Sequence, residues 1–338
     1  MKKPGKNFGT AARGVMMTLA MGAALLPATP RLSATTQSHS RGAESLLSAG
    51  KVDEAIGVLR QQTQAAPQDA RAHHLLCHAF LDIRKWDAAI SECQTAVNMD
   101  PGVSAYHMWL GRAYGEKAEH SSFISAAGLA KRSRMEFEHA VQLDSSNFDA
   151  RSDLAEFYIE APGFLGGGKE KAQAQAEAIA PHDMATSHWI HARIAEHEKN
   201  LTGAEMEYKA AIRASGNHGD RWIDLASFYR RQGRLSEMEE AVNNAIQADR
   251  KKSNLFFDAA ALLVRAGRNI PAATQFITRY LSSSDKVEEA PAFQAHYLLG
   301  SILETQGNKK AAAAEYQKAL ALAKDFDDAQ KALKRIKY

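Results

Sequence analysis

Apolar side chains recur along this chain three and four residues apart, which is the spacing of an amphipathic helix with one buried stripe. Short polar turns that contain glycine, such as the sequences AGK, QGR and QGN, separate successive segments of this kind. The pattern therefore predicts antiparallel helical hairpins. Because a single hairpin leaves one apolar face uncovered, we expect the hairpins to stack so that each buries the face of its neighbour.

The hairpins recur with a period of 34 residues, which separates Pro67 from Pro101. When the repeat is numbered so that these prolines occupy position 32, small residues fall at two other fixed positions. Position 15 is glycine at Gly50, Gly233, Gly267 and Gly307, and position 20 is alanine at Ala55, Ala89, Ala204, Ala272 and Ala312. Self-similarity at this period, with small residues where helices cross, predicts an all-α array of about eight stacked hairpins.

The period is interrupted near residues 120–130, 161–168 and 282–291. At the first interruption the second helix of the third repeat arrives ten residues late, so either its first helix is extended or a loop intervenes. We expect the array to span residues 35–328. A lysine-rich helix over residues 329–338 would then cap the stack with a polar face.

Residues 1–34 do not fit the repeat and have the layout of a secretory signal peptide. An apolar stretch over residues 14–26 ends at Pro27, with candidate cleavage points after Ala28 and Ala34. The stretch is shorter than the roughly 20 residues that span a bilayer, so we expect no stable membrane span after cleavage. Basic residues precede and follow the apolar stretch at Lys2, Lys3, Lys6, Arg13 and Arg31. The protein is therefore predicted to be exported, to a periplasm or to the outside of the cell.

Export changes the charge of the chain. The full sequence carries a formal net charge of +3, but residues 1–34 hold five basic and no acidic residues, which leaves −2 for the mature chain. A nearly neutral mature chain offers no electrostatic argument for nucleic acid binding.

The recurring register resembles the tetratricopeptide repeat from about Ala43 to Asp328. Typical features are small residues such as Gly111 and Gly300 where the two helices of a hairpin cross. The resemblance implies a right-handed superhelical solenoid that binds protein or peptide partners in a concave groove, with no catalysis and no cofactor. The sequences GRAYG, SAAGLAKR and APGFLGGG are also similar to a block in exported bacterial repeat proteins, from which no activity transfers.

The same resemblance assigns the groove to particular positions of the first helices. Trp189, Phe257 and Tyr297 share one of these positions, where they either anchor a partner peptide or pack against neighbouring repeats. The groove positions used for partner binding are Met108, Arg112, Trp189, Arg193, Arg230, Arg231, Phe257 and Tyr297.

Cys77 and Cys93, the two cysteines, lie in the two helices of the second repeat and face the same interface. In an exported protein such a pair is a candidate disulfide. The alternative is two small buried side chains packed side by side.

An alternative function, a metal-dependent or enzymatic module, depends on the histidines around Cys77. His73 and Cys77, and likewise His74 and His78, are one helical turn apart, and one such pair with Cys93 would supply three zinc ligands. The histidines fall on different helix faces, so one metal ion does not gather all of them. We therefore predict surface or core histidines and no metal.

The segment Gly163–Lys169, GFLGGGK, matches the spacing of a phosphate-binding loop up to its lysine. Glu170 stands where the chemistry requires a hydroxyl for magnesium, and a helix rather than a strand precedes the segment. We therefore expect a glycine-rich turn between two helices. No GxSxG nucleophile motif occurs in the chain.

Overall fold

The computed structural model describes residues 34–336, which contain seventeen α-helices, one short 3₁₀ turn and no strand. The predicted leader lies outside the described residues apart from its last position. Within the described range, no helix is both long enough and apolar enough to cross a bilayer. The predicted all-α fold is confirmed.

Sixteen of the described helices form eight hairpins, and a last helix follows them. They are α1 (Ala34–Ser48) with α2 (Val52–Ala65), α3 (Ala70–Asp82) with α4 (Trp86–Met99), α5 (Ser104–Glu119) with α6 (Phe123–Leu143), α7 (Phe148–Glu160) with α8 (Lys169–Ile179), α9 (Met184–His197) with α10 (Leu201–Ala214), α11 (Gly219–Arg231) with α12 (Leu235–Ala248), α13 (Asn254–Ala266) with α14 (Ile270–Ser282), α15 (Ala292–Thr305) with α16 (Lys309–Leu322), and α17 (Asp327–Ile336).

The turns inside the hairpins explain the glycine at position 15 of the repeat. Gly50, Gly233, Gly267 and Gly307 all adopt φ between 61° and 79°, a left-handed conformation that glycine takes without steric cost. Arg84 and Lys199 occupy the same position in two other hairpins and adopt φ of 59° and 63°. The turn geometry is therefore common to these hairpins even where the glycine is missing.

The helices of a hairpin approach most closely at glycine, as the sequence predicts. A Cβ atom at Gly111 would lie 2.7 Å from the ring of Phe137, and one at Gly300 would lie 2.6 Å from the ring of Tyr316. Real Cβ atoms do not come so close to aromatic carbons. Each glycine thus admits an aromatic side chain from the second helix of its own hairpin.

The interruption in the third repeat is an extension of its second helix. The first helix, α5, ends at Glu119, and α6 runs for 21 residues from Phe123 to Leu143. At 16 residues α5 is longer than the 13-residue first helices α3, α7 and α11, so the expected extension of the first helix accounts for part of the delay, and the longer second helix accounts for most of it. The alternative of a long loop is wrong. The run FISAAGLAKR has no proline to prevent it from continuing the helix.

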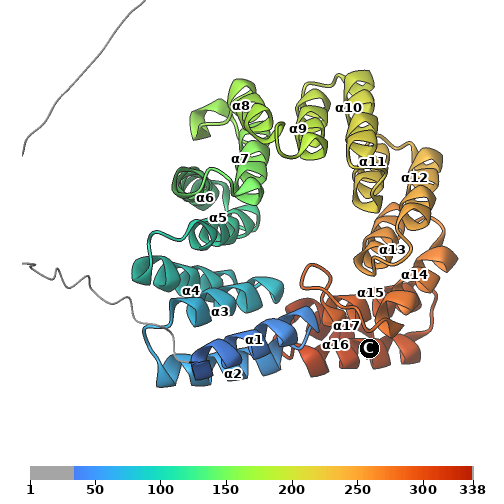
Figure 1. Ribbon diagram of the computed structural model, residues 1–338. Helices are drawn as coiled ribbons and strands as arrows, with labels where there is room; N and C mark the ends of the chain where they lie inside the picture. The colour runs from blue at the N-terminus through green and yellow to red at the C-terminus, as the bar shows by residue number, and fades with distance from the viewer. Residues whose placement is uncertain (1–33, 337–338) are drawn as a thin grey trace, which may run out of the picture.

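The array bends into a ring. Figure 1 shows the hairpins following one another around a central space, with the first helix of each pair facing inward, and both views place α1 and α2 beside α16 and α17. Phe293, Phe326 and Ala329, from the last hairpin and α17, belong to the same apolar cluster as Ala43, Leu47 and Leu76 from the first two hairpins. The two ends of the array therefore share one core.

We call the contact between residues 50–85 and residues 288–328 the seam. A Cβ atom at Gly50 would lie 2.3 Å from the backbone nitrogen of Ala292, so the first turn approaches α15 as closely as glycine permits. The carboxylate of Asp53 accepts a hydrogen bond of 2.9 Å from the backbone nitrogen of Lys324. Backbone contacts thus align the two ends of the array.

Ion pairs add to the seam. Three of them join the second hairpin to the end of the chain: Arg84 to Asp328 at 2.7 Å, Lys85 to Asp327 at 2.9 Å, and His78 to Glu288 at 2.6 Å. The final helix was expected to cap the stack with a polar face, and Lys331, Lys334 and Arg335 of α17 are exposed. Helix α17 begins at Asp327, buries Ala329 and Ala332, and uses its first two carboxylates to close the ring.

Candidate functional site

A cavity of about 1000 Å³ lies on the inner side of the ring. Its walls come from α3, α5, α6, α7 and α9, from the turn after α7, and from Gln294 of α15 across the seam. Because the wall includes both ends of the array, the cavity in this form exists only when the ring is closed. We call it the inner cavity.

Aromatic and apolar side chains form part of the inner cavity. The ring of Trp109 lies 3.5 Å from the imidazole of His78, centroid to centroid, and the guanidinium of Arg112 lies 4.8 Å from the Trp109 ring. Phe157 and Leu165 contribute further apolar surface, and both side chains are partly exposed. Such surfaces, with charged groups beside them, are suited to holding a ligand with both apolar and polar groups.

Charged side chains line the rest of the inner cavity and mostly pair with one another. The Nε of Arg112 donates to the carboxylate of Asp153 at 2.6 Å across two neighbouring hairpins. Burial raises the pKa of Asp153, although the charge of Arg112 and the hydrogen bond from it act in the opposite direction. The pair fixes the orientation of α5 relative to α7.

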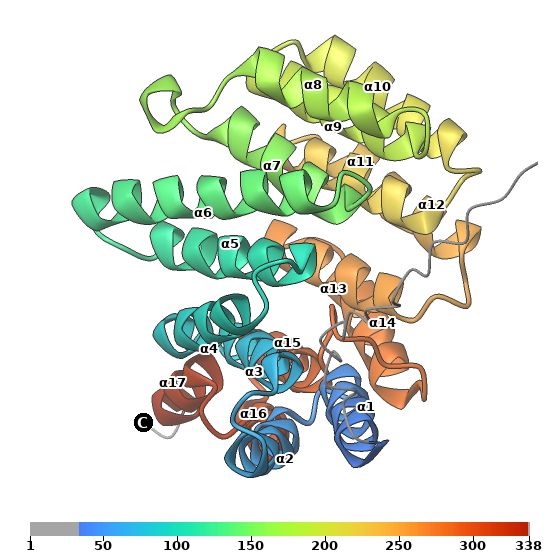
Figure 2. The same cartoon turned by 60° about the vertical axis from the view of Figure 1, so that its left-hand side comes forward.

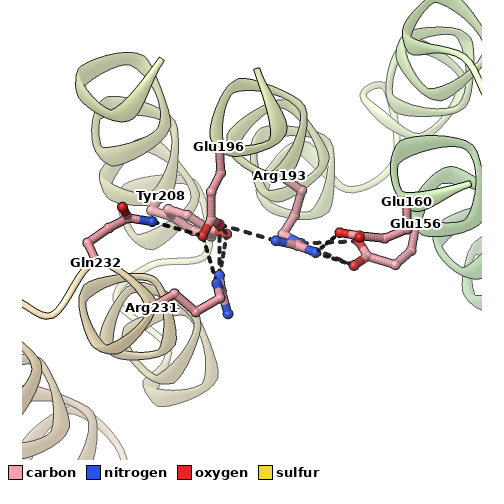
Figure 3. A network of polar contacts seen from close by, with 7 residues as sticks. All are labelled: Glu156, Glu160, Arg193, Glu196, Tyr208, Arg231 and Gln232. Atoms are coloured by element: carbon pink, nitrogen blue, oxygen red, sulfur yellow. Dashed lines mark hydrogen bonds and ion pairs between the residues drawn. The ribbon is translucent and has the colours of Figure 1, made fainter. Parts of the chain in front are cut away.

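Arg193 of α9 is the centre of a larger network (Figure 3). Its guanidinium contacts Glu156 and lies 2.7 Å from Glu160, both on α7, and it lies 3.2 Å from Glu196 one turn along its own helix. These carboxylates raise the pKa of Arg193 despite its burial, so the side chain stays charged. The network therefore ties α9 to α7 through the contacts of Arg193 with Glu156 and Glu160.

Glu196 continues the network away from the cavity. Its carboxylate accepts hydrogen bonds from Arg231 at 2.7 Å and from the hydroxyl of Tyr208 at 3.0 Å. Burial acts to raise the pKa of Glu196, but the hydrogen bonds and charges of Arg231 and Arg193 lower it overall. Three consecutive hairpins are thus connected through polar groups on their inner helices.

The structure distributes the groove residues expected from the sequence over three settings. Arg112 and Arg193 line the inner cavity. Arg230 and Arg231 lie on α11, outside the cavity. Met108 is only 5% exposed and packs in the core, so its expected place at a groove surface is wrong.

The three aromatic groove candidates are partly buried and keep part of their surface exposed. Trp189 packs against the apolar clusters on both of its sides. The ring of Phe257 lies 5.9 Å from that of Tyr280, and the ring of Tyr297 lies 5.6 Å from that of Tyr316, in each case on the second helix of the same hairpin. Both alternatives for these residues, packing and the anchoring of a partner, stay open. Two residues that the sequence did not single out, Trp109 and Phe157, contribute aromatic surface to the cavity.

The cysteine and histidine cluster of the second repeat forms no metal centre. Cys77 and Cys93 form a disulfide with a Cα–Cα distance of 5.2 Å, which engages both sulfur atoms. His73 pairs with Glu92 and His78 with Glu288, and burial lowers the pKa of His74 to about 2. Among the described residues, no group of three histidine, cysteine, aspartate or glutamate side chains is placed to hold a metal ion.

The structure shows that four histidines have a common role that the sequence analysis missed. Each lies at position 4 of its repeat and pairs with a glutamate on the second helix of the same hairpin, at distances of 2.6 to 2.7 Å. The pairs are His73–Glu92, His107–Glu136, His188–Glu207 and His296–Glu315. Three of the four have a sequence separation of 19 residues, a regularity that the repeat numbering contains.

The segment Gly163–Lys169 forms the turn expected from the sequence. A 3₁₀ turn, η1 (Gly163–Leu165), follows α7, and Gly166 with φ of 96° leads the chain toward α8. The Nζ of Lys169 lies 2.6 Å from the carboxylate of Glu198. The lysine of the phosphate-loop pattern is therefore held by a neighbouring helix.

Comparisons with known proteins agree with the repeat architecture. Residues 46–113 and residues 257–325 each match a model of the tetratricopeptide repeat. No curated protein sequence matches the chain.

Solved structures give the same result for the fold. Yeast Tom70 is 13% identical, with a TM-score of 0.53, and the match covers 85% of this chain and 58% of that one. A thermophilic repeat protein of Thermus thermophilus is 18% identical, with a TM-score of 0.46, and the match covers 68% of this chain and 99% of that one. A repeat protein of Parabacteroides merdae is 16% identical, with a TM-score of 0.42, over 80% of this chain and 100% of that one. The Tom70 match supports the predicted superhelix of helical hairpins.

Proposed function

Because the chain is a tetratricopeptide-repeat protein, we propose that it is a non-catalytic scaffold that binds a segment of another protein on the inner surface of its ring. The observation that carries the proposal is the inner cavity of about 1000 Å³. Its size suits several side chains of a peptide, and its mixture of aromatic and charged groups suits a polypeptide ligand.

Ion pairs between neighbouring hairpins in the wall of the inner cavity support a binding role. In the inner cavity Asp153 is engaged by Arg112, and Glu156 and Glu160 are engaged by Arg193. These groups fix the relative positions of inner helices, which is what a preorganised binding surface requires.

We further propose that the scaffold is exported. The basic and apolar pattern of residues 1–34 and the disulfide between Cys77 and Cys93 support this location, because disulfides persist in oxidising compartments. Fractionation of the native cells, with mass spectrometry of the mature N-terminus, tests the location. A protein that stays in the cytoplasm with residues 1–34 intact would contradict it.

Capture of partners with a cavity-filled variant tests the binding site. Ala118 lies in the wall of the inner cavity, whereas Ala174 is exposed on α8. We expect Ala118→Trp to fill the cavity and to reduce the recovery of crosslinked protein partners from the native envelope at least tenfold. The matched control Ala174→Trp should capture the same partners as the wild type. Equal capture by all three proteins would contradict binding at the inner cavity.

A further inference from the structure

We propose that the segment bound in the inner cavity is positively charged and contains both lysine or arginine residues and apolar residues. This inference rests on the proposed function and adds the chemistry of the partner. Four features of the cavity support it. They are the excess of carboxylates, the carboxylates without an ion-pair partner, the C-terminal ends of two inner helices and the positions of the apolar side chains.

Carboxylates outnumber cations in the wall of the inner cavity. The acidic members are Asp82, Glu116, Glu119, Asp153, Glu156 and Glu160, and the basic members are Arg84, Arg112 and Arg193. The basic members are already engaged, Arg112 by Asp153, Arg193 by Glu156 and Glu160, and Arg84 by Asp328 in the seam. The arginines therefore leave three carboxylates of the cavity without compensation.

These three carboxylates are Asp82, Glu116 and Glu119. Among residues 34–336, no lysine, arginine or histidine nitrogen lies within ion-pair distance of any of them. The Oδ2 atom of Asp82 is buried and has no hydrogen-bond partner among the described residues. Burial, with the nearby charges of Glu288 and Glu289, raises the pKa of Asp82 well above its usual value. A cationic group bound beside Asp82 would lower this pKa again and would give the buried oxygen a partner.

The negative groups lie at the ends of helices that point the same way. Helices α3 and α5 are the first helices of consecutive hairpins, and they end at Asp82 and Glu119. Unpaired carbonyl groups give the C-terminus of a helix a partial negative charge. Two such ends, together with their carboxylates, make this side of the cavity attractive to ammonium and guanidinium groups.

Apolar groups alternate with the charges. Trp109 and Gly115 lie on the same inner helix as Glu116, and Phe157 lies on α7 beside Glu156 and Glu160. Because rings and carboxylates lie next to one another on α5 and α7, a bound segment meets both kinds of group along its length. Lysine and arginine also bury their own aliphatic stems against such rings. An acidic peptide, an anionic lipid surface or a nucleic acid would instead be repelled by the excess of carboxylates.

Selection from a randomised twelve-residue peptide display library tests the inference. We expect peptides retained by the wild type, and not by the Ala118→Trp variant, to be enriched in lysine and arginine relative to the input library. Retained peptides without that enrichment, or with enrichment in aspartate and glutamate, would overturn the inference but leave the proposed function standing. Retention of the same peptides by the Ala118→Trp variant, or no retention at all, would overturn both.

A quantitative comparison uses the best retained peptide, labelled with fluorescein, in an anisotropy titration. The triple variant Asp82→Asn, Glu116→Gln, Glu119→Gln should raise the dissociation constant about tenfold at low salt. This is the effect expected from the loss of one or two ion pairs. The control Glu177→Gln, Glu240→Gln, Asp285→Asn removes the same charge from exposed positions outside the cavity and should bind like the wild type. Equal affinity of the two triple variants would contradict the inference.

Discussion

The contact that closes the ring combines a shared apolar cluster with exposed ion pairs, and it joins segments that no short link holds together. Around α9 to α14 the core is apolar, and Tyr208, Phe228 and Tyr280 are almost completely buried there. At the seam, Arg84 pairs with Asp328, and Lys85 with Asp327, in positions that remain partly exposed to solvent. Exposed ion pairs of this kind contribute roughly 0.2 to 1 kcal/mol each, far less than a buried aromatic side chain.

The difference shows which contacts determine the shape of the molecule. Neighbouring hairpins are joined by short links, so their apolar faces meet whether or not the ring is closed. The seam joins residues more than 200 positions apart, as in the contact of Gln294 with Asp82 and the pair of His78 with Glu288. Its closure depends on the sum of small rotations between hairpins, on the apolar cluster that the two ends share, and on exposed polar contacts. Because no short link holds the two ends together, the seam should open before any hairpin unfolds.

The largest effect is expected in the apolar interior. Phe228→Ala should lower the free energy of unfolding by about 3 to 5 kcal/mol, because the side chain is fully buried and the space it leaves does not fill. Urea denaturation followed by circular dichroism measures the change. Leu201→Ala, at a side chain that is 39% exposed, is the control and should change stability little. A loss at Leu201 as large as that at Phe228 would contradict the assignment of the core.

A smaller effect is expected from the disulfide beside the seam. Cys77 and Cys93 are 16 residues apart, and a crosslink that closes a loop of about 15 residues stabilises by about 3 kcal/mol in the chain-entropy model. The double variant Cys77→Ala, Cys93→Ala should lose up to about that amount in urea denaturation. Reductant should lower the wild type to the same stability and leave the double variant unchanged. If reductant leaves the wild type unchanged, the disulfide makes no contribution.

The histidine–glutamate pair of the third hairpin should make stability depend on pH. The hydrogen bond that His107 donates to the carboxylate of Glu136 raises the pKa of His107, with a smaller contribution in the same direction from the carbonyl of Pro101, although burial opposes them. The folded state therefore binds this proton more tightly than the unfolded state. The stabilisation is complete below the unfolded pKa of about 6.5 and is lost as the pH rises through the folded pKa.

The measurement compares His107→Gln with the wild type by urea denaturation at pH 6 and at pH 9. The variant should be less stable than the wild type at pH 6 by about 1 to 2 kcal/mol, the value of a hydrogen bond to a charged group, and the difference should shrink at pH 9. His197→Gln, at an exposed histidine, is the control. A difference between His107→Gln and wild type that does not change with pH would show that the pair does not titrate as described.

The smallest effect on stability, with the largest effect on shape, is expected at the seam. Arg84→Glu with Lys85→Glu places like charges opposite Asp327 and Asp328, and should lower the free energy of unfolding by no more than about 1 kcal/mol per pair. Small-angle X-ray scattering should nevertheless show a larger radius of gyration, because the ring opens.

Two further variants control this experiment. Adding Asp327→Lys and Asp328→Lys to the seam variant restores opposite charges and should restore the compact form. Lys131→Glu with Arg213→Glu makes the same change in net charge at exposed positions away from the seam and should leave the scattering unchanged. A compact seam variant would show that the ion pairs do not hold the ring closed.

The repeat fold was predictable because each hairpin is encoded locally. The period of 34, the turn glycines and close-packing residues such as Gly111 and Gly300 each depend on contacts within one hairpin. The histidine–glutamate pairs were predictable in principle, since His73 and Glu92 occupy fixed positions of the repeat. They were missed because the histidines were judged as metal ligands or as surface or core residues rather than by position in the repeat.

The ring and the cavity were not predictable in the same way. Closure depends on the rotation between successive hairpins, which results from the packing of many side chains and has no local signature. The contribution of Gln294 to the same cavity as Asp82 follows only from closure. The groove positions carried over from the family resemblance failed at Met108 because that side chain lies in the core, 5% exposed, in this array.

The closed ring is the central claim, and a distance across the seam tests it most directly. Glu54 and Asp325 are exposed residues on its two sides, adjacent to Asp53 and Lys324, which share a hydrogen bond of 2.9 Å. Spin labels at Glu54 and Asp325 should give one short and narrow distance distribution in pulsed electron resonance. The Arg84→Glu, Lys85→Glu variant should shift it to longer distances. A long and broad distribution in the wild type, as an open superhelix would give, would contradict the account.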